Sequence, residues 1–93
     1  MTPISFHILL ALAWRDETAG KLLDQINTDL AGSMLVARRS YYAALTRLAG
    51  RGWIESRPSG REVSYHLSPL GRRMLEQEKA RYGRAARLLV ERL

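Results

Sequence analysis

The sequence predicts a mainly α-helical domain with one small β-hairpin, in the order helix, helix, helix, hairpin, long helix. Two observations carry this prediction. Residues 37–55 place apolar side chains on one side of a helix-length block and arginines on the other. The residues that follow alternate as two strands do, around a Pro-Ser-Gly-Arg turn. This order is typical of a winged helix-turn-helix, here with a long C-terminal dimerisation helix.

Charge and size set the first limits on function. The chain has 93 residues, with 15 Lys and Arg against 9 Asp and Glu, which gives a net charge of +6. A basic excess on a small domain favours a polyanionic partner, either nucleic acid or an anionic membrane surface. A chain of this length buries only about 60–65% of its unfolded surface, so we expect it to gain apolar contacts by forming a dimer.

Missing residues and motifs exclude several other classes. The absence of cysteine rules out disulfides, thiolate zinc sites and cysteine nucleophiles, and it fits a reducing cytoplasm. The apolar run 8–14 is too short to span a bilayer, and residues 1–5 lack the basic start of a signal peptide. His7 and His66 are far apart in sequence, and no nucleophile–base pair or glycine-rich phosphate loop appears. We therefore expect a cytoplasmic protein that is not an enzyme, holds no metal or cofactor and binds no membrane.

The first two helices are predicted over residues 4–14 and 19–30. The first is apolar almost all the way round, which predicts that one side faces the core and another faces a partner subunit. Either Ser5 or Thr2 would begin it. The second has one apolar face and follows a polar break at residues 16–18.

The third helix is predicted over residues 38–50, after a link whose residues 34–36 are expected to form a short extended piece that pairs with the hairpin. One face of the third helix is expected to join the core, and it holds Tyr41, Ala44, Leu45 and Leu48. The opposite face holds Arg39, Tyr42, Ala43, Thr46 and Arg47. Gly52 then suits a left-handed turn that ends the segment.

The hairpin is predicted to consist of strands at residues 53–57 and 62–67, joined by a turn at Pro58-Ser59-Gly60. Its aromatic residues, Trp53 and Tyr65, are expected to pack in the core rather than to bind a ligand.

From Ser68 or Pro69 onward the sequence predicts one helix to the end of the chain. Its apolar stripe is too long for so small a domain to bury alone, which predicts pairing with a second subunit. The chain thus divides into a winged-helix DNA-binding domain at 1–68 and a dimerisation helix at 69–93, which form one unit. The residues expected in the dimer interface are Phe6, Leu10, Leu75, Tyr82, Ala86, Leu89 and Leu93.

Three segments resemble the PadR-like family of bacterial winged-helix transcription regulators, in that family's order and at nearly its spacing. They are TAGKLLDQI at 18–26, RRSYYAALTRLAGRGWI at 38–54 and SYHLSPLGRRML at 64–75. The last resembles the family's Tyr-Tyr-x-Leu-Thr-x-x-Gly junction between strand and helix. The resemblance covers roughly residues 5–93. MarR-like regulators share the plan but usually run longer.

This sequence departs from the family pattern at the start of two helices. Lys21 stands where an aromatic residue is usual, and Arg38 and Arg39 replace a Pro-Gly pair. Ala37 occupies a position where a capping Ser is common, and the loss of such a cap costs a helix about 1 kcal/mol.

The resemblance implies a sequence-specific transcription regulator, most often a repressor, that acts as a homodimer on a pseudo-palindromic operator. It also implies an apolar pocket that senses a small aromatic effector, which Trp14, Met74 or Tyr82 would line. A winged-helix adaptor that binds proteins instead of DNA is the alternative function.

Contacts with double-stranded DNA are expected from the third helix in the major groove and from the hairpin on phosphate or the minor groove. The candidates are Arg38, Arg39, Ser40, Tyr42, Thr46, Arg47, Arg57, Ser59 and Arg61. On a surface without DNA, the same arginines would only keep the protein soluble.

Overall fold

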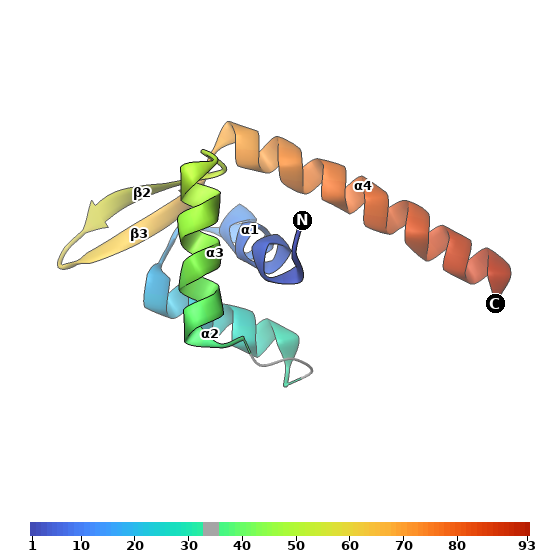
Figure 1. Ribbon diagram of the computed structural model, residues 1–93, viewed down its shortest axis with the longest axis horizontal. Coiled ribbons are helices and arrows are strands. Elements are labelled where there is room, and N and C mark those ends of the chain that lie inside the picture. The colour runs from blue at the N-terminus through green and yellow to red at the C-terminus, as the bar shows by residue number, and fades with distance from the viewer. Residues whose placement is uncertain (33–35) are drawn as a thin grey trace.

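The computed structural model describes residues 1–32 and 36–93 and is shown as a ribbon in Figure 1. The helices and strands, in chain order, are α1 (Pro3–Trp14), β1 (Glu17–Thr18), α2 (Ala19–Leu30), α3 (Arg38–Gly50), β2 (Ile54–Ser59), β3 (Glu62–Leu67) and α4 (Pro69–Arg92). The predicted extended piece at 34–36 lies outside the described residues except for Val36. The amide of Val36 donates a hydrogen bond of 3.2 Å to Oδ1 of Asn27. The fold is mainly helical with a small antiparallel sheet, as the sequence predicts.

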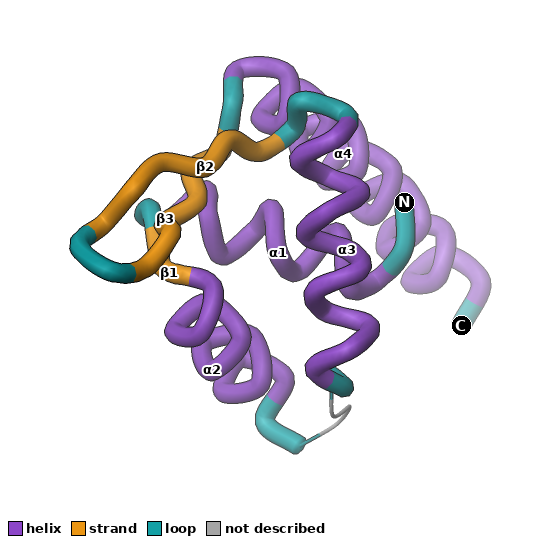
Figure 2. Tube along the Cα trace, turned by 60° about the vertical axis from the view of Figure 1, so that its left-hand side comes forward, coloured by secondary structure: helices purple, strands orange, loops and turns teal. Residues whose placement is uncertain are grey.

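Helix α1 lies at the centre of the domain, and Figure 2 shows α2, α3 and α4 around it. Thr2 caps the helix, since its Oγ1 accepts a hydrogen bond of 3.2 Å from the amide of Ser5. Of the two helix starts that the sequence allowed, Ser5 and Thr2, the structure has Thr2. Leu10 and Trp14 lie on a part of α1 that the chain leaves exposed, as expected of a helix with a second apolar face.

The core sits where α1, α2, α3 and the base of the hairpin meet. Its largest fully buried side chains are Ile8, Leu9, Leu22, Ile26, Tyr41, Leu45, Leu48 and Ile54. Burying each aliphatic side chain contributes about 1.5–3 kcal/mol. The predicted core face of α3 is confirmed, because all of its members are buried. Trp53 and Tyr65 also pack against this core, as predicted.

The sheet has three strands in the order β1-β3-β2, all antiparallel. The polar break predicted at 16–18 was wrong in part: Glu17 and Thr18 form β1 and pair with Tyr65 and Ser64 of β3. Strand β2 also runs farther than predicted, through Pro58 and Ser59. Pro58 is tolerated there because β2 is an edge strand, where a missing amide hydrogen costs little.

A polar joint fastens the hairpin to α4. The amide of Ser68 donates 3.1 Å to the carbonyl oxygen of Trp53, and its hydroxyl lies 2.6 Å from the carbonyl oxygen of Gly52. The same hydroxyl caps α4 by accepting from the amide of Gly71 at 3.0 Å. Gly71 packs so closely that a Cβ at this position would overlap the carbonyl oxygen of Trp53. The start of α4 is therefore fixed against the end of the loop that follows α3.

Helix α4 divides into a packed half and a projecting half. Leu75 is buried in the core of its own chain, and every residue from 79 to 93 is exposed. Figure 1 shows this second half extending away from the rest of the domain. Leu75 was predicted for the dimer interface, but it is 8% exposed within its own chain and belongs to the hydrophobic core there.

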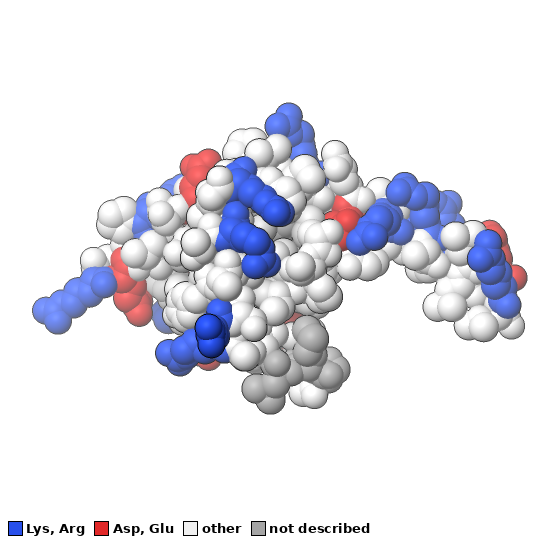
Figure 3. All heavy atoms as spheres, in the orientation of Figure 1, with Lys and Arg blue, Asp and Glu red and all other residues white. Residues whose placement is uncertain are grey.

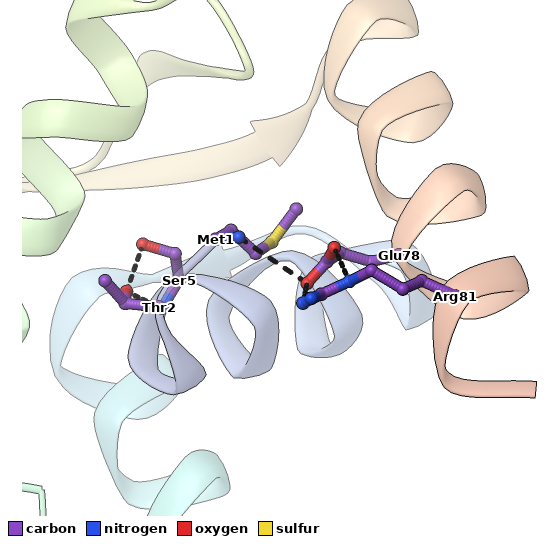
Figure 4. A network of polar contacts seen from close by, with 5 residues as sticks. All are labelled: Met1, Thr2, Ser5, Glu78 and Arg81. Atoms are coloured by element: carbon purple, nitrogen blue, oxygen red, sulfur yellow. Dashed lines mark hydrogen bonds and ion pairs between the residues drawn. The ribbon is translucent and has the colours of Figure 1, made fainter. Parts of the chain in front are cut away.

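Glu78 marks the boundary between the two halves, as Figure 4 shows. Its carboxylate accepts two hydrogen bonds of 2.9 Å from Arg81, and the α-amino group of Met1 lies 3.6 Å away. The hydrogen bonds from Arg81 lower the pKa of the Glu78 carboxyl below its usual value, with the charges of Arg81 and the amino group acting in the same direction. The network ties the start of α1 to the middle of α4.

Candidate nucleic-acid interface

Helix α3 presents a polar face to solvent, on the side opposite to its core face. All six residues predicted to contact DNA from this segment are exposed: Arg38, Arg39, Ser40, Tyr42, Thr46 and Arg47. Figure 3 shows lysine and arginine side chains over this part of the molecule. A helix of this width with an exposed polar face has the shape that the major groove admits.

The N-terminus of α3 has no side-chain cap. Ala37 is the N-cap residue and its side chain makes no capping hydrogen bond, and the first turn has no acidic residue. The free amide groups and the helix dipole together favour an anion at this end. Arg38 and Arg39 add two positive charges at the same place, so the departure from the usual Ser cap leaves room for a phosphate.

Two side chains on the exposed face are held by local contacts. The ring of Tyr42 meets that of buried Tyr41 edge to face, with centroids 5.0 Å apart. The hydroxyl of Thr46 donates 3.0 Å to the carbonyl oxygen of Tyr42, so toward a ligand it serves as an acceptor. The arginines therefore carry the charged donors of this face.

Arg51 belongs to the same surface but is missing from the sequence-based candidates. It follows the last residue of α3, is exposed, and its guanidinium carbon lies 5.5 Å from the centroid of the Trp53 ring. The helical wheel could not reveal it because it lies beyond the helix. An arginine directly after a basic helix is the signal that would have found it. With Arg51, residues 37–51 hold four arginines and no carboxylate.

The hairpin is exposed but not basic overall. Arg57, Ser59 and Arg61 are all exposed, as a DNA contact requires. The two arginines are balanced within the strands by Glu55 and Glu62. Over residues 54–67 the formal charges of the hairpin therefore sum to zero.

Carboxylates also contact residues of the hairpin. Nη1 of Arg57 lies 4.0 Å from Oδ2 of Asp16, which directly precedes β1. Oε2 of Glu55 lies 3.1 Å from Nε2 of His66 on the neighbouring strand. Of these two elements, α3 therefore carries the net positive charge, and the hairpin supplies shape and two arginines with acidic neighbours.

A surface pocket of about 340 Å³ lies between α1 and α2. Its lining residues are Leu10, Ala11, Trp14, Arg15, Glu17, Leu22, Gln25 and Asp29. Of the three residues named for an aromatic-ligand pocket, only Trp14 lines it. Tyr82 instead meets the ring of Phe6 edge to face, with centroids 5.0 Å apart.

Within residues 1–32 and 36–93, no group of three or more His, Asp or Glu residues is placed to hold a metal ion. In the same residues, no helix combines the length and the apolar character needed to cross a membrane.

No protein-family model and no curated protein sequence matches the chain. Solved structures do match it in fold. A PadR family transcription regulator from Clostridium difficile superposes with a TM-score of 0.86 at 20% identity, over 97% of this chain and 97% of that one. A transcriptional regulator from Clostridium thermocellum gives a TM-score of 0.85 at 18% identity, over 95% and 87% of the two chains.

A third similar structure is ZitR from Lactococcus lactis, a zinc-responsive MarR family member. It gives a TM-score of 0.70 at 19% identity, and the match covers 98% of this chain and 60% of that one. At these identities the likeness establishes the fold: the chain is a winged helix, and its long C-terminal helix is part of the shared architecture in the PadR regulator, which is matched over nearly its full length.

Proposed function

We propose that this protein is a PadR-like, sequence-specific DNA-binding transcription regulator that acts as a homodimer. The observation that carries the proposal is the exposed face of α3, where residues 37–51 combine four arginines, no carboxylate and an uncapped helix N-terminus. A protein-binding adaptor has no need of this concentration of positive charge. The winged-helix fold supports the same conclusion, since similar structures are those of transcription regulators.

In the proposed complex, α3 enters the major groove. Arg39 and Arg47 are the candidates for bidentate hydrogen bonds to guanine O6 and N7, which distinguish one base pair from another. Arg38 and Ser40 lie at the uncapped end, where phosphate is favoured. The hairpin residues Arg57, Ser59 and Arg61 then contact the backbone or the minor groove beside it. This division assigns base recognition to α3 and positioning to the helix start and hairpin.

The proposed homodimer uses apolar surface that the single chain leaves uncovered. On the projecting half of α4, Leu89 is 59% and Leu93 is 96% exposed, and on α1 Leu10 is 46% exposed. Leu89 and Leu93 lie one turn apart at the end of α4, and exposed apolar side chains grouped in this way mark an interface in a soluble protein. The predicted interface therefore keeps Phe6, Leu10, Tyr82, Ala86, Leu89 and Leu93, without Leu75. A two-fold axis would place two α3 helices about one turn of DNA apart, on a pseudo-palindromic operator.

A dimer bound over a promoter would act as a repressor by excluding polymerase, in the bacterial cytoplasm. The pocket beside Trp14 is the place for a small aromatic effector, because an exposed indole and two leucines offer a flat apolar contact. Binding there is tested by the fluorescence of Trp14 in a Trp53→Phe background, titrated with planar aromatic compounds. Unchanged fluorescence across the panel would remove the effector from the proposal.

The central test begins by selecting preferred duplexes from a random library with the intact protein. Fluorescence anisotropy then compares the parent with Arg39→Ala and Arg47→Ala on the selected duplex. Each lost bidentate contact should weaken binding by about 10-fold or more, because such contacts contribute about 1–3 kcal/mol. Arg15→Ala is the control, since this arginine is exposed but pairs with Glu17 away from α3. A selection without enrichment, together with no salt dependence of duplex binding, would favour the adaptor function.

A further inference from the structure

Positive charge is concentrated in two separate segments of equal length. Residues 37–51 around α3 and residues 79–93 at the end of α4 each have a net charge of +4, the latter from five Lys and Arg against one Glu. Since the whole chain has a net charge of +6, the remaining residues together have −2. The proposed DNA contacts account for the first segment and leave the second without a role.

The cations of α4 are open to solvent. Every residue of 79–93 is exposed, and the ion pairs seen in the described chain engage only one cation of this segment, Arg81, with Glu78. Figure 3 shows lysine and arginine side chains along the projecting helix on the same face of the molecule that shows those over α3. One face of the molecule therefore presents positive charge at two places that are separated along its length.

Two of these cations lie away from the apolar stripe. At about 100° per residue, Arg84 and Arg87 fall about 180° and 120° from the line that joins Leu75 and Leu93. A partner subunit that covers the stripe would leave both arginines in solvent. Pairing two helices that each carry +4 also costs repulsion, so self-association does not explain this charge.

We propose that the projecting half of α4 is a second DNA-backbone surface, on which Arg84 and Arg87 bind phosphates of the duplex that flanks the operator. The inference rests on the proposed function, and it adds contacts outside the part of the duplex that α3 and the hairpin cover. Arginine suits this task because its guanidinium donates two hydrogen bonds to one phosphate and carries charge at any physiological pH. These contacts carry no base specificity, so they add affinity for any flanking sequence.

The test measures affinity against salt for two duplexes, one limited to the selected operator and one extended by two helical turns on each side. The variant Arg84→Gln/Arg87→Gln should bind the short duplex like the parent. On the long duplex, the slope of log K against log salt should decrease in magnitude by about 3.6, because the homodimer loses four phosphate contacts that each contribute about 0.9. Arg84→Lys/Arg87→Lys keeps the charge and should restore most of the slope.

Equal slopes of the Gln variant and the parent on the long duplex would overturn the inference. Loss of dimer mass in the Gln variant by sedimentation would also overturn it, in favour of a role in self-association. If the parent, but not the Gln variant, co-sedimented with phosphatidylserine vesicles and the slopes were equal, the surface would be one for an anionic membrane. Arg39→Gln separates the two proposals, since it should weaken binding to both duplexes. If that variant binds both as the parent does, the proposed function itself fails.

Discussion

The hydroxyl of Tyr41 on α3 donates a hydrogen bond of 2.6 Å to the carbonyl oxygen of Ala19, the first residue of α2. The ring of Tyr41 is fully buried, so the bond lies at the edge of the core rather than in solvent. The bond joins the first residue of α2 to the first turn of α3, and it thereby fixes the position of α3 relative to α2. The bond therefore helps to hold in place the exposed face of α3 that is proposed to bind DNA.

Replacing Tyr41 with Phe should lower the free energy of unfolding by about 1 kcal/mol, because the hydrogen bond from the Tyr41 hydroxyl to the carbonyl oxygen of Ala19 is lost. Urea denaturation followed by circular dichroism measures the difference. Tyr42→Phe is the matched control. The Tyr42 side chain is exposed, so the loss of its hydroxyl group should leave the midpoint unchanged. Equal midpoints for Tyr41→Phe and the parent would show that the bond contributes nothing.

Stability should also depend on pH through Tyr41. Burial raises the pKa of the Tyr41 hydroxyl well above its ordinary value, with the nearby Tyr42 and Tyr65 acting in the same direction. Below the unfolded pKa of about 10 the group is protonated in both states, so its contribution is constant. Above about pH 10 the unfolded chain loses the proton first, and stability falls by up to about 1.4 kcal/mol per pH unit. The advantage of the parent over Tyr41→Phe should therefore shrink above pH 10, and a constant difference would contradict the assignment.

Gly71 and Gly83 offer a matched pair of substitutions on α4. Gly71→Ala should destabilise the protein by about 2 kcal/mol or more, because the new methyl group overlaps the carbonyl oxygen of Trp53. Gly83→Ala should stabilise it by up to about 1 kcal/mol, because its Cβ meets no atom within 4 Å and alanine favours a helix. Thermal unfolding of the two variants checks both signs. An unchanged melting temperature for Gly71→Ala would mean that the backbone around Ser68 shifts at little cost to accommodate the methyl group.

Asp16 should restrain binding through the hairpin. Its carboxylate lies 4.0 Å from Arg57 and competes with phosphate for the guanidinium. Asp16→Asn should therefore raise affinity for the selected duplex, by less than about 10-fold because exposed pairs are weak. Asp24→Asn on α2 removes the same charge elsewhere and should have a smaller effect. In an Arg57→Gln background, Asp16→Asn should lose its effect, and an effect that persists would reflect net charge alone.

The proposed dimer predicts different outcomes on two sides of α4. Leu89→Asp should yield a monomer in sedimentation equilibrium, because a buried charge in the apolar seam is unfavourable. Ala80→Asp places the same charge about 140° from the line that joins Leu75 and Leu93, and it should remain dimeric. A parent that sediments as a monomer at every concentration would exclude the dimer.

The helices were predictable because their apolar residues recur at helical spacing and their starts carry clear signals. Pro3 and Pro69 mark helix starts, and every helix bound predicted from the sequence lies within one residue of the observed one. The face of α3 followed from the same periodicity. Local sequence patterns were sufficient to predict those features, helix bounds and the buried face of α3, that depend on a single element.

Predictions failed where pairing with distant residues decides the structure. Glu17 and Thr18 have no alternating pattern of their own, and they become a strand only because β3 offers them a free edge. Leu75 shares its spacing with the exposed stripe, and periodicity alone does not tell which chain covers it. Arg57 looked like a free cation because Asp16 is far away in sequence and close only in the fold.

The close packing of Gly71 has a mechanical consequence. Helix α4 has 24 residues and is about 36 Å long, so a tilt of about 5° at its first turn moves its far end by about 3 Å. That displacement is close to the rise of one base pair, which is about 3.4 Å. In a homodimer held together by α4, the contact between Gly71 and the carbonyl oxygen of Trp53 would therefore fix the angle at which α4 leaves the domain. That angle would set the spacing between the two α3 helices, and so the register of the two half-sites along the DNA.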